Sequence, residues 1–443
     1  MCCLKKMNKE YVFRRKQMIK KMVPKSAFII FSAEEKIRNA DNKYKYRQDS
    51  NFFYLTGFNE PKSLLILVKQ IKYNKCILFN QNTNELKKIW GENNIGQESA
   101  IKLLKIDYSY SWNNINNKLY LILNNLDTIY YQFGINDKND KLLFMAINIL
   151  RKKKIINKNF SPPNNFSDLI PVLQKIRLIK SKEEICKIKH ACFVTKLAHI
   201  RAIKYCKPEK YEYELAAEIQ HEFLINGNLD NSYNIIVGSG INTCILHYIE
   251  NKRKMKSGEL VLIDAGCEYK NYASDVTRTI PVNGKFSKEQ LVIYNVVLEM
   301  LNLFIKLCKP KSKIKNIKNK VIHLLVKRLK HIGLLSGNIK DLIYQKSYKK
   351  YFMHKLFHFI GLDVHDTSDY LINNKNFYLK SGMTIAIEPG IYIPINKKIK
   401  SPYQGIGIRI EDNILITKKG NINLTKDIVR KSIEIENLMK KNK

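Results

Sequence analysis

The sequence predicts two domains, an N-terminal α/β domain followed by a C-terminal α+β domain made of two similar halves. Over about the first 170 residues, short β-rich runs alternate with helical stretches. After that, a pair of helices precedes a β-rich segment twice, about a hundred residues apart, which is the order that a duplicated α+β half gives. At 443 residues the chain is long enough for two domains and a large core.

The N-terminal domain has apolar runs of strand length with helical stretches between them. The segment 46–58 mixes aromatic and polar residues densely, and its periodicity predicts core packing around a turn. Paired prolines within 161–165 predict the linker, because proline cannot continue a helix or a central strand. We therefore place the two domains at 1–172 and 173–443. The predicted strands are 27–31, 64–68, 76–79 and 128–131.

Two helix pairs organise the C-terminal domain. Ser181 and Glu184 form a capping box that begins a long helix, and a second helix covers about 211–224 before Gly227. The arrangement recurs further along the chain. A capping box of Ser287 and Gln290 begins a third helix, and a fourth covers about 314–331.

The net charge of +39 is the most unusual feature of the composition. Such a charge first suggests nucleic-acid binding. However, the lysines are spread over the whole length together with many asparagines and isoleucines, and A/T-rich codons would enrich all three residue types together. We therefore expect no specific nucleic-acid partner. With 45% apolar and 26% charged residues, the composition is that of an ordinary globular protein.

The cysteines and the apolar runs indicate where the protein resides. No run of 18 or more apolar residues occurs, and the first residues lack the apolar segment of a signal peptide. The nine cysteines are scattered without CxxC spacing, which suggests neither a disulfide framework nor a zinc ribbon. We expect a cytoplasmic protein with reduced cysteines and no membrane association.

Two aspartates follow strand-like runs in the middle of the C-terminal domain. Asp264 ends an apolar run, and Asp275 begins a second β-rich run after a turn-like segment, so the pattern predicts a β-hairpin. If the two runs pair, the carboxylates face each other and repel unless a cation lies between them. Taken alone, the pair is also consistent with two solvated surface aspartates.

Three further clusters lie downstream of the hairpin. Three of the nine histidines, His354, His358 and His365, fall within twelve apolar-rich residues. Glu388 ends a strand-like run directly before Pro-Gly. The run 407–412 is predicted to be one strand with Arg409 and Glu411 on the same face. A carboxylate on a hydrophobic strand is rarely buried unpaired, so these acids indicate a shared cation site.

Together the clusters supply four carboxylates and one or more histidines, with no cysteine among them. Oxygen-rich ligation with a single imidazole suits Mn²⁺, Co²⁺, Fe²⁺ or Zn²⁺ in a two-metal site rather than a structural zinc. Carboxylates can bridge two cations and offset their charge. Two metal ions held in this way activate water and polarise a carbonyl, which is the chemistry of amide hydrolysis.

At these residues the chain resembles aminopeptidase P (Xaa-Pro aminopeptidase) of the pita-bread metallopeptidase family, over nearly its whole length. The resemblance implies a C-terminal pita-bread catalytic domain, a duplicated α+β fold, behind an N-terminal α/β domain. It also implies cleavage of the bond before a proline in the second position of a peptide. The segments that carry it are 46–58, 89–91, 237–240, 244–248, the 264/275 hairpin, 354–365, 388–390 and 409–412.

The resemblance assigns roles to individual residues. Asp264 would bind one metal ion, His358 and Glu388 the other, and Asp275 and Glu411 would bridge the two. Glu388 would also move protons between the attacking water and the leaving nitrogen. The metal pair implied is most consistent with two Mn²⁺ ions.

The resemblance further implies a substrate-binding wall. His247 and His365 would line the substrate site and steady the tetrahedral intermediate. His354 and Arg409 would form the proline-side pocket, with Tyr392 close by. Implied partners are peptides with penultimate proline and further copies of the chain, in a dimer or tetramer.

Two departures and two alternatives accompany this interpretation. Where the family has small residues, this chain has Lys355, Leu356 and Phe357, which predicts bulk beside the site. Asn271 and Ser274 stand where glycine is common. The alternatives are a prolidase acting on Xaa-Pro dipeptides, and a pita-bread protein that binds without catalysis. Residues 46–58 and 89–90 favour the aminopeptidase over the prolidase, and the full ligand set disfavours the binding protein.

Overall fold

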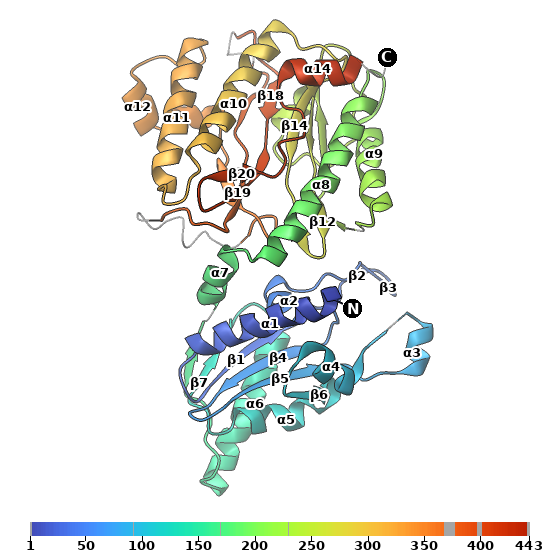
Figure 1. Cartoon of the computed structure of the whole chain (residues 1–443), viewed down its shortest axis with the longest axis vertical. Helices are drawn as coiled ribbons and strands as arrows, with labels where there is room; N and C mark the ends of the chain where they lie inside the picture. The colour runs from blue at the N-terminus through green and yellow to red at the C-terminus, as the bar shows by residue number, and fades with distance from the viewer. Residues whose placement is uncertain are drawn as a thin grey trace. The chain divides into compact units, whose positions relative to one another are not determined.

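The computed structural model describes residues 2–91, 93–168, 170–228, 230–366, 377–396 and 401–440, with the side chains of 2–8 and 87 outside the description. The N-terminal side chains that argued against a signal peptide therefore lie outside the described residues, as do 441–443 at the end of the second predicted domain. The chain divides into two compact units, Met1–Ile176 and Arg177–Lys443 (Figure 1).

The N-terminal unit is built on one mixed six-stranded sheet with the order β6-β5-β4-β1-β7-β8 (Figure 1). The four predicted strands correspond to β1, β4, β5 and β7. The prediction of a helix between every pair of strands is wrong for β4 and β5, which are joined antiparallel through residues 70–73. A turn this short permits only antiparallel pairing. The sheet is therefore mixed rather than parallel.

The elements of this unit are as follows. The strands are β1 (Ser26–Phe31), β2 (Ile37–Asn39), β3 (Asn42–Lys43), β4 (Leu64–Lys69), β5 (Asn74–Asn80), β6 (Tyr108–Ser111), β7 (Thr128–Tyr130) and β8 (Asn165–Ser167). The helices are α1 (Cys2–Lys21), α2 (Ser50–Thr56), α3 (Glu85–Ile89), α4 (Gly96–Leu104), η1 (Trp112–Asn114), α5 (Ile115–Leu123) and α6 (Asp137–Ile156), and α7 (Ile170–Leu178) spans the division between the units.

The aromatic segment 46–58 contains a short helix, α2, rather than a turn alone. The Asp49 carboxylate accepts a hydrogen bond from the Phe52 N–H at 2.8 Å, and Gly57 ends the helix in the left-handed region. Such caps satisfy backbone groups that a short helix cannot pair internally. Phe52 and Leu55 are fully buried, so the predicted core packing is confirmed.

The predicted linker at 161–165 is wrong. Pro162 and Pro163 are buried, and the chain continues directly into β8, which pairs parallel with β7 at the edge of the sheet. Proline is tolerated at the entrance to an edge strand, so a proline pair does not by itself mark a linker.

The C-terminal unit repeats the order of two helices and then a sheet, as predicted. The helices α8 and α9 precede a three-stranded sheet, β10-β11-β14. The helices α10 and α11 precede a four-stranded sheet, β15-β16-β19-β20, and a separate ribbon, β17-β18. Both predicted capping boxes are present, at Ser181 with Glu184 and at Ser287 with Gln290.

The elements of the C-terminal unit are as follows. The helices are α8 (Lys182–Tyr205), α9 (Glu212–Ile225), η2 (Gly240–Cys244), α10 (Lys288–Leu307), α11 (Ile314–His331), α12 (Ile339–Tyr344), η3 (Ser347–Lys350) and α14 (Ser432–Lys440). The strands are β9 (Asp230–Asn231), β10 (Ile236–Ser239), β11 (Leu260–Asp264), β12 (Cys267–Tyr269), β13 (Tyr272–Ala273), β14 (Thr277–Pro281), β15 (Phe357–Phe359), β16 (Thr384–Ile387), β17 (Gly390–Ile393), β18 (Ile406–Arg409), β19 (Asp412–Ile416) and β20 (Asn421–Asn423).

The predicted hairpin around Asp264 is more elaborate than a turn. β11 pairs antiparallel with β14, but Asp264 lies opposite Thr277, and Asp275 precedes the strand. Between them a small hairpin, β12-β13, joins the separate sheet that contains β9. At the crossing, a Cβ on Gly266 would lie 1.9 Å from the Ser274 carbonyl oxygen, so only glycine fits.

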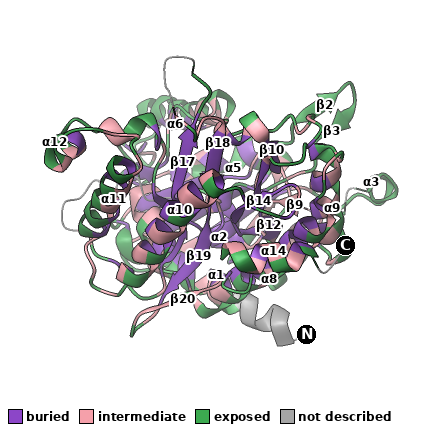
Figure 2. Cartoon of the chain, turned by 90° about the horizontal axis from the view of Figure 1, so that it is seen from above, coloured by how far each residue is buried: buried purple, intermediate pink, exposed green. Residues whose placement is uncertain are grey.

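The core of this unit lies between the sheets and the long helices. Figure 2 shows β17, β18 and β19 in the colour of buried residues, and every residue of these strands is buried. Among the described residues, α10 alone is long and apolar enough to cross a membrane by length and composition. Its residues Ile293, Val297 and Phe304 are fully buried in the core cluster, so packing within the unit accounts for its apolar face.

Candidate metal centre

Three of the predicted ligands converge on one buried point. The ligand atoms of Asp275, His358 and Glu411 all lie within 4.8 Å of one another. His358 Nε2 lies 3.3 Å from Asp275 Oδ2 and 3.7 Å from Glu411 Oε1. The three residues come from the segment before β14, from β15 and from the link between β18 and β19, so both halves of the unit contribute.

Glu388 joins the same cluster from the end of β16. Its Oε1 lies 3.9 Å from His358 Nε2, and its main-chain N–H donates to the Leu356 carbonyl at 3.0 Å. Pro389 follows directly and cannot extend the ladder. The strand therefore ends with this carboxylate at the site.

Asp264 is connected to the cluster through a tyrosine. The Tyr233 hydroxyl lies 2.5 Å from Asp264 Oδ1 and 2.5 Å from Asp275 Oδ1. The other carboxylate oxygen, Asp264 Oδ2, accepts a hydrogen bond from Arg409 Nη2 at 2.5 Å. All five predicted ligands are thus brought together in one region.

Hydrogen bonds between the two halves fix the ligands. The Thr277 hydroxyl donates to Glu411 Oε2 at 2.9 Å, and the Glu411 N–H donates to the Thr277 carbonyl at 3.0 Å. Asn413 binds the main chain of Asp275 through both of its amide atoms, at 3.0 and 2.5 Å. The first sheet cannot shift against the second without breaking these bonds.

The predicted single strand over 407–412 is wrong. β18 ends at Arg409 and β19 begins at Asp412, in a different sheet. Ile410 and Glu411 connect the two. The change of sheet turns the Glu411 side chain toward Asp275, which an unbroken strand would not require.

The carboxylates of the cluster repel one another in a buried site. Burial, with the Glu411 charge second, raises the pKa of Glu388 to about 8. Burial, with the Asp275 charge second, raises the pKa of Glu411 to about 8, and burial raises that of Asp275 to about 6. For His358, burial lowers the pKa, but the nearby carboxylates of Asp275 and Glu411 outweigh burial, so the net shift is upward.

The donor set fits a pair of divalent cations. Glu411 Oε1 is buried without a hydrogen-bond partner among the described residues. A buried carboxylate oxygen without a partner is costly unless a cation supplies the missing interaction. Four carboxylates and one imidazole are the ligands that Mn²⁺, Co²⁺, Fe²⁺ and Zn²⁺ accept in two-metal sites.

A polar wall of three residues stands beside the cluster. The Tyr392 hydroxyl lies 2.8 Å from His354 Nε2 and accepts from Arg409 Nη1 at 3.0 Å. His354 Nδ1 lies 3.3 Å from Glu388 Oε2. Burial, with Arg409 second, lowers the pKa of His354 to about 4, so this imidazole is neutral at physiological pH. The predicted proline-side residues therefore directly adjoin a predicted ligand.

His247 and His365 lie on the exposed side of the site. The His365 ring makes an edge-to-face contact with His358, with ring centroids 4.4 Å apart. Burial, with the His358 charge second and His247 third, lowers the pKa of His365 to about 4. His247 also contributes to the lowered pKa of His354, so His247, His354 and His365 lie close to one another.

The bulky residues between His354 and His358 do not fill the site. Leu356 and Phe357 are each 2% exposed and belong to the hydrophobic core, where the Phe357 ring lies 5.5 Å from that of Phe304. The expectation of bulk beside the metal centre is wrong for these two, because both side chains pack in the hydrophobic core. Lys355 is exposed.

The two positions where glycine is common differ in how well the structure accommodates their side chains. Asn271 has a φ of +68°, a value that asparagine tolerates better than most residues. The Ser274 hydroxyl lies 2.6 Å from the Thr195 hydroxyl and donates to the Cys267 carbonyl at 3.0 Å. Ser274 is therefore satisfied locally, whereas Asn271 Nδ2 is buried without a hydrogen-bond partner among the described residues.

Two residues of the site, Tyr233 and Asn413, were not predicted from the sequence. Tyr233 lies in an Asn-Ser-Tyr-Asn segment with no recognisable pattern, and nothing in its spacing connects it to Asp264. Asn413 follows Glu411 and Asp412, and its place next to a predicted ligand was a usable signal.

Family models match both units. Residues 186–418 match the model of metallopeptidase family M24, and residues 11–130 match that of the aminopeptidase P N-terminal domain. The chain belongs to metallopeptidase family M24. Membership of a metallopeptidase family supports a hydrolase over the alternative of a non-catalytic binding protein. The predicted pita-bread catalytic domain behind an N-terminal α/β domain is confirmed.

Curated M24 relatives match over almost the whole chain. The chain is 44% identical to the Xaa-Pro aminopeptidase of Escherichia coli, with 97% of each chain covered. It is 41% identical to that of Haemophilus influenzae, also with 97% of each chain covered. Identity to Xaa-Pro aminopeptidase 3 of Homo sapiens is 32%, with 97% of this chain and 85% of the relative covered.

Solved M24 structures share the fold of the chain. Zinc-substituted E. coli aminopeptidase P in complex with product matches with a TM-score of 0.95 at 43% identity, covering 98% of this chain and 99% of that one. Proline aminopeptidase P II from Yersinia pestis matches with a TM-score of 0.95 at 44% identity, covering 98% and 100%.

Proposed function

We propose that the chain is an Xaa-Pro aminopeptidase, which releases the N-terminal residue of peptides with proline in the second position. The observation that carries the proposal is the convergence of Asp275, His358 and Glu411 within 4.8 Å, beside the wall of His354, Tyr392 and Arg409. Relatives of that name, 44% and 41% identical over nearly the full length, support the substrate class.

The proposed metal ions are two Mn²⁺. Asp264 would hold one, His358 and Glu388 the other, and Asp275 and Glu411 both. When bound, such a pair of cations supplies a nucleophile from water and polarises the scissile carbonyl. The choice of manganese rests on the oxygen-rich donor set, which also accepts Co²⁺, Fe²⁺ and Zn²⁺.

The side chains of the site transfer the proton and stabilise the charge that develops during cleavage. The nitrogen of an Xaa-Pro bond carries no hydrogen, so the departing proline must receive a proton. Glu388 adjoins the proline-side wall through His354, whose Nδ1 lies 3.3 Å from Glu388 Oε2, so Glu388 carries that proton. His365, neutral because its pKa is lowered, donates a hydrogen bond to the charge that develops on the carbonyl oxygen, with His247 beside it.

The substrate amino terminus gives the reason for exopeptidase action. Four carboxylates at one site attract a free ammonium group, which only the first residue of a peptide offers. The planar Arg409 guanidinium donates to Asp264 and to the Tyr392 hydroxyl, so it lies beside this acidic cluster. A peptide bound in this way presents its first peptide bond to the cluster.

The test is release of the N-terminal residue from an Xaa-Pro-Xaa tripeptide by chelator-treated protein, before and after addition of Mn²⁺. We expect release only with metal, and its loss in Asp275→Asn. Asp427→Asn, an exposed aspartate outside the site, is the matched control and should retain activity. An Xaa-Pro dipeptide distinguishes the prolidase, because preferential cleavage of the dipeptide would contradict the proposal.

The chain is also proposed to form a homo-oligomer in the cytoplasm. Ile89 and Trp90 are 82% and 87% exposed, and large apolar side chains this exposed favour contact with another protein surface. The scattered cysteines favour a reducing compartment. Light scattering of the purified chain tests the first point, and a mass equal to that of one chain would contradict it. Cell fractionation tests the second.

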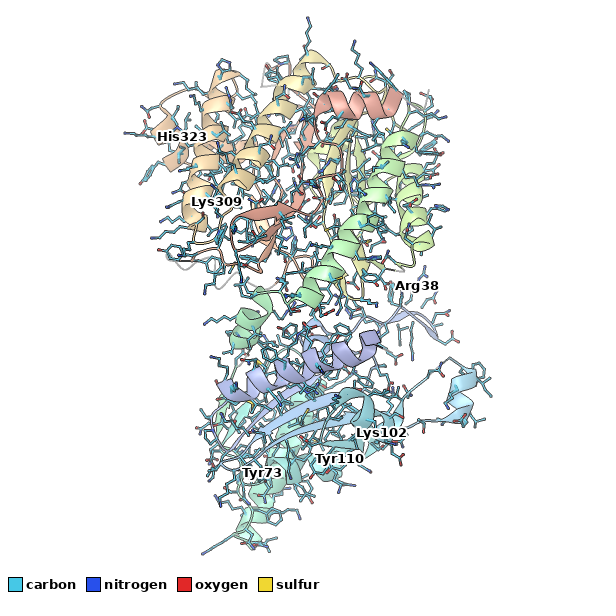
Figure 3. All side chains as sticks on the ribbon, in the orientation of Figure 1. Arg38, Tyr73, Lys102, Tyr110, Lys309 and His323 are labelled. Carbon is cyan, nitrogen blue, oxygen red and sulfur yellow. The ribbon has the colours of Figure 1, made fainter. Side chains whose placement is uncertain are left out.

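The basic charge does not change the proposal. The exposed residues Arg38 on β2, Lys102 on α4 and Lys309 after α10 lie on separate elements (Figure 3). Charge dispersed in this way is typical of a solvated surface rather than a phosphate track. We therefore continue to expect no specific nucleic-acid partner.

A further inference from the structure

A buried carboxylate outside the metal centre organises the segment that carries His247. Glu212 is the first residue of α9, and its side chain is fully buried. Its Oε1 accepts hydrogen bonds from the Ser239 N–H at 2.7 Å, the Ser239 hydroxyl at 2.7 Å and Asn242 Nδ2 at 3.2 Å. Its Oε2 accepts from the Tyr248 hydroxyl and the Arg253 N–H, both at 2.8 Å.

All five donors come from one stretch of chain, residues 239–253. The stretch leaves β10 at Ser239, passes through η2 and returns at Arg253, so it closes around a single carboxylate. Each donor is a neutral hydroxyl, amide or main-chain N–H, and together they replace the solvation that the buried charge has lost. We name this stretch the 239–253 loop.

The carboxylate is itself held in place. It lies at the N-terminus of α9, where the helix dipole favours negative charge. The Glu212 N–H donates to the Arg253 carbonyl at 3.0 Å, so main chain and side chain both bind the loop. The loop therefore takes its position from a helix of the scaffold.

Tyr248 connects this carboxylate to the active site. Its hydroxyl donates a hydrogen bond to Glu212 and accepts one from the Lys252 N–H at 3.3 Å. Its ring packs against the apolar cluster that contains Tyr392, the residue that binds His354 and Arg409. Burial and the hydrogen bond to Glu212 raise the pKa of Tyr248, so its hydroxyl remains the donor.

His247 is the residue next to Tyr248 in this loop. Its side chain is exposed, and it is close enough to His354 and His365 to affect the pKa of each. We propose that Glu212 is a positioning residue that sets the place of His247 through the hydroxyl of Tyr248. The inference rests on the proposed function, because the role of His247 toward the substrate is part of it.

The decisive variant is Tyr248→Phe, which removes one hydroxyl and keeps the ring. In the full-length, manganese-loaded protein we expect kcat/KM for an Xaa-Pro-Xaa tripeptide to fall between about 10- and 100-fold, as small displacements of a site group do. Bound metal per chain should not change. The matched control is Tyr213→Phe on α9, the helix that begins with Glu212. It removes the hydroxyl of a tyrosine that is 52% exposed, and it should leave kcat/KM unchanged.

A double-mutant cycle with His247→Ala separates positioning from general stability. If Tyr248 acts through His247, adding Tyr248→Phe to His247→Ala changes kcat/KM by less than about twofold. An equal loss in both backgrounds, or a loss of bound metal, would overturn the proposal. Glu212→Gln is the second variant, and its effect should likewise disappear in the His247→Ala background.

A readout without activity keeps this inference distinct from the proposed function. Proton–carbon NMR of histidine-labelled protein, with His247→Ala to assign the signal, should show the His247 ring signal shifted in Tyr248→Phe. The signal of the exposed His331 should remain in place. An unmoved His247 signal would overturn the positioning role. Absence of tripeptide cleavage by the parent protein would overturn only the proposed function, since the NMR result stands by itself.

Discussion

Glu411 and Asp412 are neighbours in the sequence and are both buried, at 2% and 0% exposure, yet they are treated in opposite ways. Asp412 Oδ1 lies 2.7 Å from Arg278 Nη2, and Asp412 Oδ2 lies 2.7 Å from Arg430 Nη1. Glu411 accepts one hydrogen bond from Thr277, while its other oxygen has no hydrogen-bond partner among the described residues.

The difference separates structural carboxylates from those that await a metal ion. Asp366 follows the pattern of Asp412, with Arg177 at 2.5 Å and Lys180 at 2.8 Å, both buried. At Asp412 and Asp366 the chain supplies its own cations, and these carboxylates hold the fold together. Around Glu411 it gathers further carboxylates instead, and the excess negative charge marks the place of the metal ions.

The largest expected effect is on the metal side of this comparison. Glu411→Gln keeps the size of the side chain but removes a bridging charge, so we expect affinity for Mn²⁺ and kcat/KM each to fall by more than about 100-fold. Isothermal titration and tripeptide cleavage measure the two. The metal-free variant should be at least as stable as the parent, because one of several mutually repelling carboxylates is gone. A variant that binds Mn²⁺ as the parent does would contradict the bridging role.

A substitution at the next residue, Asp412, should lower stability and leave metal binding nearly unchanged. Asp412→Asn leaves the fully buried Arg278 facing a neutral amide, so the free energy of unfolding should fall by about 3–5 kcal/mol. Denaturant titration of the metal-free protein measures this, with Asp427→Asn as the exposed control. Manganese affinity of the folded fraction should remain within about threefold, since Asp412 faces away from the ligands. An unchanged midpoint would show that the ion pairs contribute nothing net.

A smaller effect is expected from the tyrosine that joins the two aspartates. Tyr233→Phe removes a hydroxyl that lies 2.5 Å from both Asp264 and Asp275. Partners that orient metal ligands typically affect affinity or activity by 10- to 100-fold, and we expect a loss of about 10-fold in Mn²⁺ affinity. Titration calorimetry checks the value. Tyr211→Phe, at an exposed tyrosine outside the site, is the control.

A further effect is expected on the pH dependence of stability. Glu388 and Glu411 each have a folded-state pKa of about 8, above the value of about 4.3 for an unfolded glutamate. Between these values the folded metal-free chain binds more protons than the unfolded chain, so its stability is complete at low pH and is lost as pH rises through this window. The thermal midpoint should therefore fall from pH 5 to pH 8.5, by roughly 2–4 °C for each kcal/mol.

Two comparisons isolate this contribution from other titrating groups. Glu411→Gln should show a smaller fall in the midpoint over the same range, because one of the groups is absent. Adding Mn²⁺ to the parent should raise the midpoint most at the high end of the range, where the carboxylates are charged. A midpoint that rises with pH equally in parent and variant would contradict the shifted pKa values.

The sequence supplied the elements that local rules control. The capping boxes at Ser181 and Ser287 are satisfied by contacts three residues away, so they could be read directly from spacing. The ligands could be found because carboxylates that end apolar runs are unusual. The register of β11 and β14 could not be predicted, because it depends on a close approach of Gly266 to the Ser274 carbonyl oxygen. A Cβ at Gly266 would lie 1.9 Å from that oxygen.

The partners of the ligands could not be predicted either. Tyr233 reaches Asp275 across 42 residues, and Asn413 reaches the same aspartate across 138. The five donors to Glu212 carry no motif, and only the folded loop brings them to one carboxylate. Long-range hydrogen bonds of this kind depend on tertiary packing, which single-sequence patterns do not contain.

The reciprocal hydrogen bonds between Thr277 and Glu411 have a consequence for how the protein is made in the cell. A ribosome adds residues in order, and the proposed ligands emerge from Asp264 to Glu411. A nascent chain that has folded its first sheet holds only two of the five proposed ligands, Asp264 and Asp275. Peptidase activity therefore arises only when the second half docks, so an incomplete product is harmless to neighbouring polypeptides.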